Sequence, residues 1–476
     1  MRYLRALAVG ALLSVLICAY SAYAGLRMGG VYWSMTTASL VALVLLKALG
    51  NTDKNEINIL QTTANTGAMV AAGIIFTIPA ATMLGLSITV PQIIAVALLG
   101  GLAGVLFSMP LRKELVGKLP YPDGAAAAAL INAGDEGGKK ARMLFASFGA
   151  SAAFAIARFL GTVPAALSVI PIAGGYLIGP LMMAAWFGGA LVSKLLVAQE
   201  MATPLGVGIV IGAAVAYFVT KGLPAIAKIR ISGRTGLFAV VAVGLLSIAT
   251  GMDLLVSGLA MLGAAAMSYV GARVTGETNV DPMEIFAMIV LLAAKFLLGA
   301  NALPLVLLAA VVCLAAGLAG DLMQDLKTGF LLGTDANEQL KAQVVGVVAA
   351  AAAIGFILVA LDAQYGIGSA ALPAPQAVAV REIVGASSIP QTMMLGALAG
   401  AVLCVALGSF GLGAVLFGIG IYVSFELSLF LAAGALVRML ATEKRVERGR
   451  VIAAGLISGE GIVGVAVALA GLGGLL

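Results

Sequence analysis

Three acidic residues stand in stretches of the sequence that are otherwise apolar. Asp321 and Asp325 follow a long apolar run, and Glu460 lies between Gly459 and Gly461. A charge at membrane depth is costly, so each carboxylate is expected to be paired or functional. The 476 residues include no histidine, the side chain that most often carries protons near neutral pH. Proton transfer in this chain would therefore depend on carboxylates.

Asp321 and Asp325 are four residues apart and share one face if their segment is helical. We predict that they bind a proton or a substrate amine. Lys327 follows closely and would neutralise one carboxylate or contact a carboxylate of the substrate, and Gln324 is a further substrate-binding candidate. The alternative is an ion network at a re-entrant turn that water reaches.

Glu460 is predicted to carry protons as well, because its flanking glycines permit irregular backbone beside a cavity. Its alternative role is an ion pair with a basic residue of another span, such as Lys295 or Arg158. Glu426 lies near the middle of an apolar stretch over residues 411–438. For Glu426 we predict either substrate binding or a structural hydrogen bond between helices.

A polar stripe from Gln61 to Thr66 precedes Gly67 in another apolar stretch. It predicts a discontinuous or cavity-lining helix in which Gln61 and Asn65 hydrogen-bond the amides of a substrate peptide. Hydrogen bonds between helices are the alternative.

Two further polar segments hold minor substrate-binding candidates. Tyr121, before Pro122, is expected to shape a re-entrant turn or to contact substrate. Asn279 belongs to a group with Asp281 and Glu284, which the start of a helix explains by capping and by the helix dipole.

No metal or cofactor site is predicted. The three cysteines, Cys18, Cys313 and Cys404, each stand alone in an apolar run, which indicates neither a disulfide framework nor a metal pair.

The elements that position these residues must be membrane helices. Hydrophobic residues make up 62% of the chain and charged residues 10%, with a mean hydropathy of +1.12. Apolar stretches recur along the whole length, and strand-like alternation is absent. We therefore predict an all-α polytopic membrane protein with about 14 to 16 transmembrane helices, some of them re-entrant or broken. The net charge of +6 is spread over short loops and indicates no nucleic-acid partner.

The chain is predicted to consist of two related halves, 1–222 and 235–476, joined by a basic linker over 223–234. Residues 101–104 recur as 317–320, residues 140–141 as 341–342, and residues 189–192 as 434–437. The increasing separation predicts an inserted segment near 362–408 in the second half. Internal repeats are typical of secondary transporters.

Several motifs together resemble the oligopeptide transporter superfamily. They are Pro110-Leu111-Arg112-Lys113, Lys118 to Asn132 with Tyr121-Pro122, the run Asp321 to Gly329, and Gly455 to Gly461. The first three are most similar to the yellow stripe-like branch, although Leu326 stands where that branch usually has Phe. The resemblance covers most of the chain.

This resemblance implies proton-coupled symport of small peptides or peptide-like metal–chelate complexes across a plasma membrane by alternating access. A prokaryotic inner membrane suits the composition, and a homo-oligomer is compatible with it. We predict no enzymatic activity. The alternatives are a membrane channel or scaffold without proton coupling, and a magnesium-dependent intramembrane enzyme that uses Asp321 and Asp325.

Overall fold

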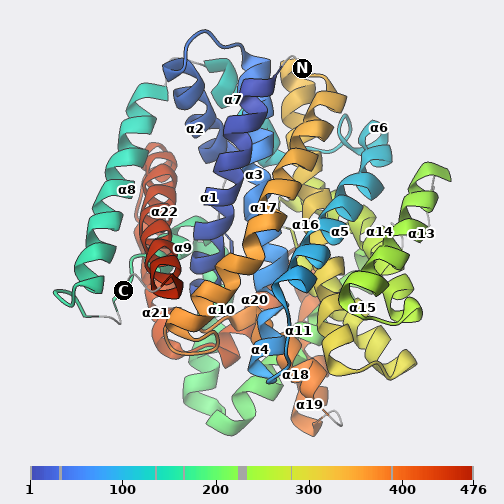
Figure 1. Cartoon of the computed structure of the whole chain (residues 1–476). Helices are drawn as coiled ribbons and strands as arrows, with labels where there is room; N and C mark the ends of the chain where they lie inside the picture. The colour runs from blue at the N-terminus through green and yellow to red at the C-terminus, as the bar shows by residue number, and fades with distance from the viewer. Residues whose placement is uncertain are drawn as a thin grey trace.

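The computed structural model describes residues 3–31, 35–133, 137–164, 167–222, 233–279, 281–386 and 390–473. These residues are almost entirely helical, which confirms the predicted all-α class (Figure 1). The longer helices of the first half are α1 (Leu4–Met28), α2 (Met35–Ala48), α3 (Lys54–Ile75), α5 (Val90–Ser108), α7 (Pro122–Ala133), α8 (Gly137–Phe159), α9 (Ile170–Ile178), α10 (Pro180–Leu196) and α11 (Gln199–Tyr217). Those that follow are α13 (Gly233–Thr250), α14 (Leu254–Thr278), α15 (Met283–Leu298), α16 (Ala302–Leu332), α17 (Ala336–Tyr365), α18 (Pro375–Gly385), α19 (Gln391–Leu407), α20 (Gly413–Tyr422), α21 (Phe425–Met439) and α22 (Glu443–Leu472).

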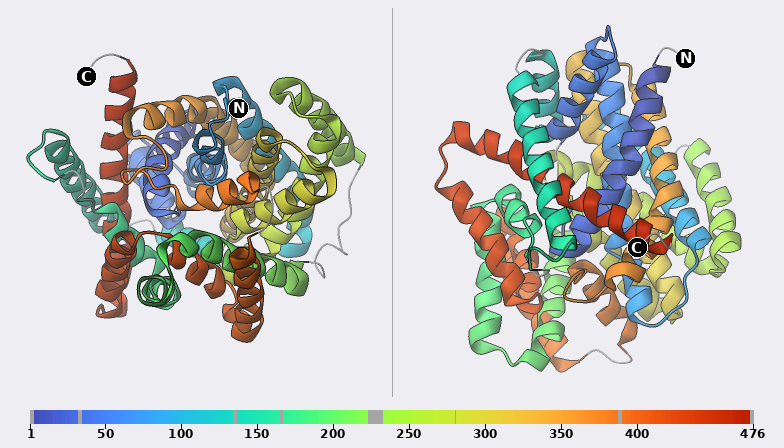
Figure 2. Two further views of the ribbon diagram at one scale, coloured as in Figure 1. Left: turned by 90° about the horizontal axis from the view of Figure 1, so that it is seen from below. Right: turned by 60° about the vertical axis from the view of Figure 1, so that its left-hand side comes forward.

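Short helical turns complete the described chain. They are α4 (Pro79–Met83), α6 (Arg112–Leu115), and three single turns at Met109–Leu111, Phe218–Gly222 and Gly408–Phe410. Figure 1 and the view from below in Figure 2 place α8 and α22 at one side of the molecule and α13 at the opposite side.

Within the described ranges, eight helices are long and apolar enough to cross a membrane, or nine if α9 and α10 form one bent span. The prediction of 14 to 16 counted each apolar run as one crossing. Several of those runs form shorter apolar helices, among them α2, α13, α19 and α20.

Two long apolar stretches of the sequence, residues 172–197 and 411–438, are broken. The run over 172–197 bends by 119° between α9 and α10, where Gly179 has a φ of +91° and Pro180 opens the second helix. The run over 411–438 divides into α20 and α21 at Val423 and Ser424. Proline lacks the backbone donor that would continue a helix, and glycine tolerates positive φ, which explains the first break.

Two interruptions that the sequence left open as alternatives are absent. The segment from Asp321 to Gly329 is no re-entrant turn, because α16 continues through it to Leu332. The α3 helix likewise passes through Gly67 without a break. Gly67 instead allows a close approach, since a methyl carbon added there would lie 2.0 Å from the carbonyl oxygen of Ser14 in α1.

The helices repeat in order along the chain. Corresponding helices begin at residues 4 and 254, 35 and 283, 54 and 302, and 90 and 336, an offset of about 250 residues. The same order pairs α7 with α18, α8 with α19, α9 and α10 with α20 and α21, and α11 with α22. The prediction of two related halves is thereby confirmed.

Contacts between backbones obey the same repeat. A methyl carbon added at Gly175 would lie 1.8 Å from the carbonyl oxygen of Leu431, and one at Gly420 would lie 1.9 Å from that of Trp186. One contact becomes the other when each residue is replaced by its counterpart in the other half. Thus α9 packs on α21 as α20 packs on α10.

This register, the alignment of the two halves by their corresponding helices, differs from two of the three short sequence matches. Only residues 189–192 and 434–437 lie at corresponding places, in α10 and α21. In this register the stretch near 362–408 contains α18 and α19, the counterparts of α7 and α8, and needs no insertion. Residues 223–232 of the predicted linker lie outside the described residues.

Four helices form the centre: α3, α5, α16 and α17. The corresponding helices α3 and α16 are antiparallel, because Gln61 contacts Asp325 while Asn65 contacts Asp321. The other corresponding pair, α5 and α17, is also antiparallel, with Gly101 beside Val347 and Ile93 beside Gly355. Corresponding helices that run in opposite directions are the signature of an inverted repeat.

Candidate functional site

The two carboxylates of α16 are held by side-chain amides from two neighbouring helices. Gln61 Nε2 of α3 donates to Asp325 Oδ1 at 2.7 Å, and Asn65 Nδ2, one turn further, donates to Asp321 Oδ1. From α17, Gln343 Nε2 donates to Asp321 Oδ2 at 2.9 Å. The i, i+4 spacing in each helix places both members of each pair on one face, so the pairs meet.

A fourth amide extends this cluster on the side of Asp325. Gln339 Nε2 of α17 donates to the backbone oxygen of Asp325 at 2.6 Å and to Thr62 Oγ1 at 3.4 Å. We call Gln61, Asn65, Asp321, Asp325, Gln339 and Gln343 the amide–carboxylate cluster. Asp325 is 0% and Asp321 8% exposed, and the four amide side chains are buried.

Among the residues that the structure describes, no lysine or arginine pairs with Asp321 or Asp325. Neutral amides offset only part of the cost of burying two ionised carboxylates. The cluster is therefore suited to taking up and releasing a proton or another cation.

Lys327 does not neutralise these carboxylates. Its Nζ donates to the backbone oxygens of Val116 and Leu119, at 3.0 and 2.9 Å, and so fastens the turn after α6 to α16. Gln324 points the same way: its Oε1 accepts from the backbone N–H of Gly124 at 2.9 Å. Of these two predicted substrate-binding residues, Lys327 thus holds the turn before α7, and Gln324 holds the first turn of α7.

Tyr121 and Asn279 belong to the same junction. Tyr121 has a φ of +43°, its backbone N–H donates to Gly276 O, and its hydroxyl donates to Ala272 O of α14 at 2.8 Å. Asn279 Oδ1 accepts from Gln324 Nε2 at 2.8 Å, and its Nδ2 donates to Asp123 Oδ1 at 3.0 Å. Together these contacts join α7, α14 and α16 beside the amide–carboxylate cluster.

Glu460 lies in α22 at 0% exposure and pairs with Arg158 of α8. Its Oε1 also accepts from the Ser168 hydroxyl at 2.7 Å, and its Oε2 from the backbone N–H of Val169 at 2.9 Å. Of the two roles that the sequence left open, the geometry favours the ion pair. The pair anchors the start of the bent helix α9 to α8 and α22.

Comparison with known proteins decides the family. The family model described as OPT oligopeptide transporter protein matches residues 4–228 and again residues 227–470. The chain belongs to the OPT oligopeptide transporter family. The double match agrees with the two related halves seen in the helices.

Two relatives carry names of the same kind. A protein of Haemophilus influenzae named as a candidate oligopeptide transporter is 34% identical over 117 residues, which are 24% of this chain and 18% of that protein. One of Saccharomyces cerevisiae, named likewise, is 29% identical over 234 residues, 43% of this chain and 32% of that protein. The matches thus span less than a third of either relative.

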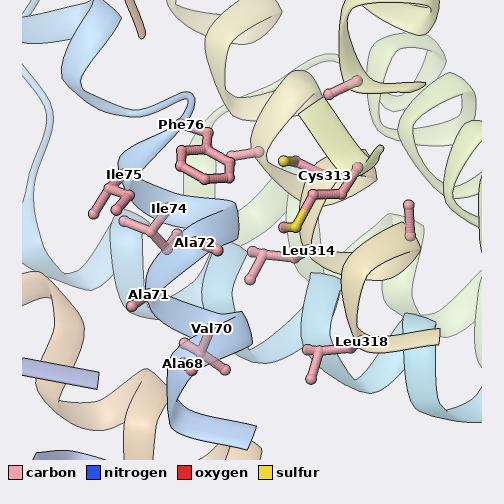
Figure 3. Close-up of a cluster of buried hydrophobic side chains, with 14 of the residues drawn as sticks. Ala68, Val70, Ala71, Ala72, Ile74, Ile75, Phe76, Cys313, Leu314 and Leu318 are labelled. Carbon is pink, nitrogen blue, oxygen red and sulfur yellow. The ribbon is translucent and has the colours of Figure 1, made fainter. Parts of the chain in front are cut away.

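In this OPT family member, the amide–carboxylate cluster is present at only one of the two positions that the repeat makes equivalent. In the register of α3 with α16, Asn65 corresponds to Cys313 and Asp321 to Gly73. Figure 3 shows that second position, where α3 near Ala72 and Phe76 just after it lie beside Cys313, Leu314 and Leu318 of α16 in a buried apolar cluster. The two positions that the repeat makes equivalent therefore differ: one is packed with apolar side chains, and the other holds the amide–carboxylate cluster.

Glu426 is not at the middle of a continuous span. It is exposed in the first turn of α21, directly after the break that divides residues 411–438. It lies on different helices from the amide–carboxylate cluster.

Gln339 and Gln343 complete the cluster, but they were not among the residues predicted from the sequence. Their signal is two amides, four residues apart, at the start of the apolar stretch that forms α17. The sequence alone gives no indication that this face meets Asp321.

Replacing Arg158 with Met is expected to lower the free energy of unfolding by about 3–5 kcal/mol, because it leaves the Glu460 carboxylate buried and unpaired. The measurement is thermal unfolding of the purified protein in detergent. The double variant R158M/E460Q should recover much of the loss. If R158M unfolds like the wild type, the ion pair contributes little to stability.

Proposed function

We propose that this OPT family member is a secondary active transporter of small peptides or peptide-like metal–chelate complexes. It moves them across the plasma membrane by alternating access, driven by protons that bind at Asp321 and Asp325. The observation that carries the proposal is the amide–carboxylate cluster at one of two positions that the repeat makes equivalent. Because the equivalent position is filled by apolar packing, we infer that the carboxylates are present to bind an ion that crosses the membrane.

The arrangement of the helices supports alternating access. Inverted repeats and bent helices let one half rock against the other around a fixed site. The cluster lies where α3 and α16, one helix from each half, cross. A change in its protonation would alter the contacts between the halves.

The geometry supports different tasks for the predicted site residues. Gln61 and Asn65 hydrogen-bond the carboxylates, so we assign them to ion coupling. We expect these hydrogen bonds to change when a carboxylate is protonated. Gln324, Asn279 and Tyr121, at the adjoining junction of α7 with α14 and α16, are the substrate-side candidates in our proposal. The peptide substrate class rests on the family, and the metal–chelate class on the yellow stripe-like motifs in Asp321–Gly329 and Lys118–Asn132.

The test is uptake into proteoliposomes of a small peptide library and of metal-loaded chelators, with and without a pH gradient acidic on the uptake side. We expect accumulation only with the gradient, for one of the two substrate classes. Equal flux with and without the gradient would support a channel instead. No flux of either class, in protein shown to be folded, would contradict the proposed substrates.

A further inference from the structure

The connection between α14 and α15 carries a buried carboxylate that proton coupling at Asp321 and Asp325 does not use. Both oxygens of Asp281 are enclosed, and neither has a hydrogen-bond partner. The capping role expected from the sequence is not seen, because Pro282 occupies the position before α15 and no side chain caps that helix. An enclosed carboxylate without a donor or a cation is costly.

A second oxygen without a partner lies at the same place. Thr275 of α14 is 5% exposed, and its buried hydroxyl has no hydrogen-bond partner. Gly320 of α16 stands against both groups: a methyl carbon added there would lie 2.6 Å from Asp281 Oδ2 and 2.6 Å from Thr275 Oγ1. Two oxygens from separate elements therefore converge where α16 has no side chain.

The electrostatic surroundings of this place are acidic. Burial raises the pKa of Asp281 well above its usual range, and the nearby carboxylates of Glu284 and Asp321 raise it further. Both oxygens of Asp321 already accept hydrogen bonds from Asn65 and Gln343. Asp281 thus differs from Asp321 in that neither of its oxygens has a hydrogen-bond partner.

We propose that Asp281 and Thr275 bind a sodium ion in the space beside Gly320. Oxygen ligands suit a hard cation, and ion sites in transporters commonly form where helices are interrupted. One free carboxylate balances a monovalent cation. A proton on Asp281 would neutralise the charge and let one carboxyl oxygen donate to Thr275, whereas sodium contacts all three oxygens. The inference goes beyond the proposed function, because it adds an ion site separate from the proton-coupling pair.

The test needs no transport. Thermal unfolding of the purified full chain in detergent is compared in NaCl, KCl and choline chloride at equal ionic strength, over a range of pH. We expect a saturable rise in Tm with Na⁺ alone. Because Na⁺ needs the ionised carboxylate, its apparent affinity should fall by about tenfold for each pH unit below the pKa of Asp281.

Two variants test the ligands. D281N and T275V should lose the Na⁺-specific rise, and D281N should be at least as stable as the wild type in choline chloride because it removes a buried charge. D253N is the matched control, since Asp253 lies exposed at the other end of α14 and should leave the rise unchanged. Equal stabilisation by all three salts, a Na⁺ effect that survives in D281N, or a response to pH without one to Na⁺ would overturn the proposal. None of these outcomes bears on proton-driven uptake, which is measured separately.

Discussion

Replacing Asp325 with Asn abolishes proton-driven accumulation of substrate while leaving the protein folded: this is the result we expect from the amide–carboxylate cluster. Asn keeps a side-chain oxygen that accepts the hydrogen bond from Gln61, so the contact of 2.7 Å between α3 and α16 survives. It removes the group that binds and releases the proton. Because it also removes a buried acid without a cationic partner, the free energy of unfolding should stay the same or increase.

The measurement for D325N separates coupling from binding. Uptake driven by a pH gradient should fall by more than about tenfold, whereas exchange of labelled for unlabelled substrate without a gradient should continue. D335N is the control, because Asp335 caps α17 from an exposed position and Asn caps a helix equally well. If D325N accumulates substrate like the wild type, the proton binds elsewhere.

Several residues of this cluster could be identified from the sequence, but the contacts between them could not. Asp321 with Asp325, and Gln61 with Asn65, each have the spacing of one helix turn, so the polar face of each helix could be predicted. That the two faces pack against each other depends on the antiparallel crossing of α3 and α16. No local pattern encodes such a crossing between helices that begin about 250 residues apart.

The errors at the other positions have a common physical cause. Hydropathy measures whether a segment prefers lipid, not whether it is continuous. Residues 172–197 and 411–438 are mostly apolar and are nevertheless broken, whereas Asp321–Gly329 is polar and continues α16. Buried polar residues in α16 find partners within the protein, so their polarity marks an interior face and not the end of a span.

A second large effect is expected where the two halves cross at the bent helices. A methyl carbon added at Gly189 of α10 would lie 2.0 Å from the carbonyl oxygen of Phe417, and one at Gly434 of α21 would lie 1.8 Å from that of Ile172. Backbone cannot move aside as a side chain does. G189A and G434A should each therefore lower the free energy of unfolding by about 3 kcal/mol, and by similar amounts because the repeat relates the two contacts.

The neighbouring glycine provides the control for this prediction. A methyl carbon at Gly188 would meet nothing closer than the Phe417 ring at 3.9 Å, so G188A should unfold at the wild-type Tm. Thermal unfolding in detergent compares the three variants. Equal loss in G189A and G434A with none in G188A would establish that the crossing of α9 and α10 with α20 and α21 is symmetric in energy as well as in shape. Unequal losses in G189A and G434A, or no loss in either, would contradict the prediction.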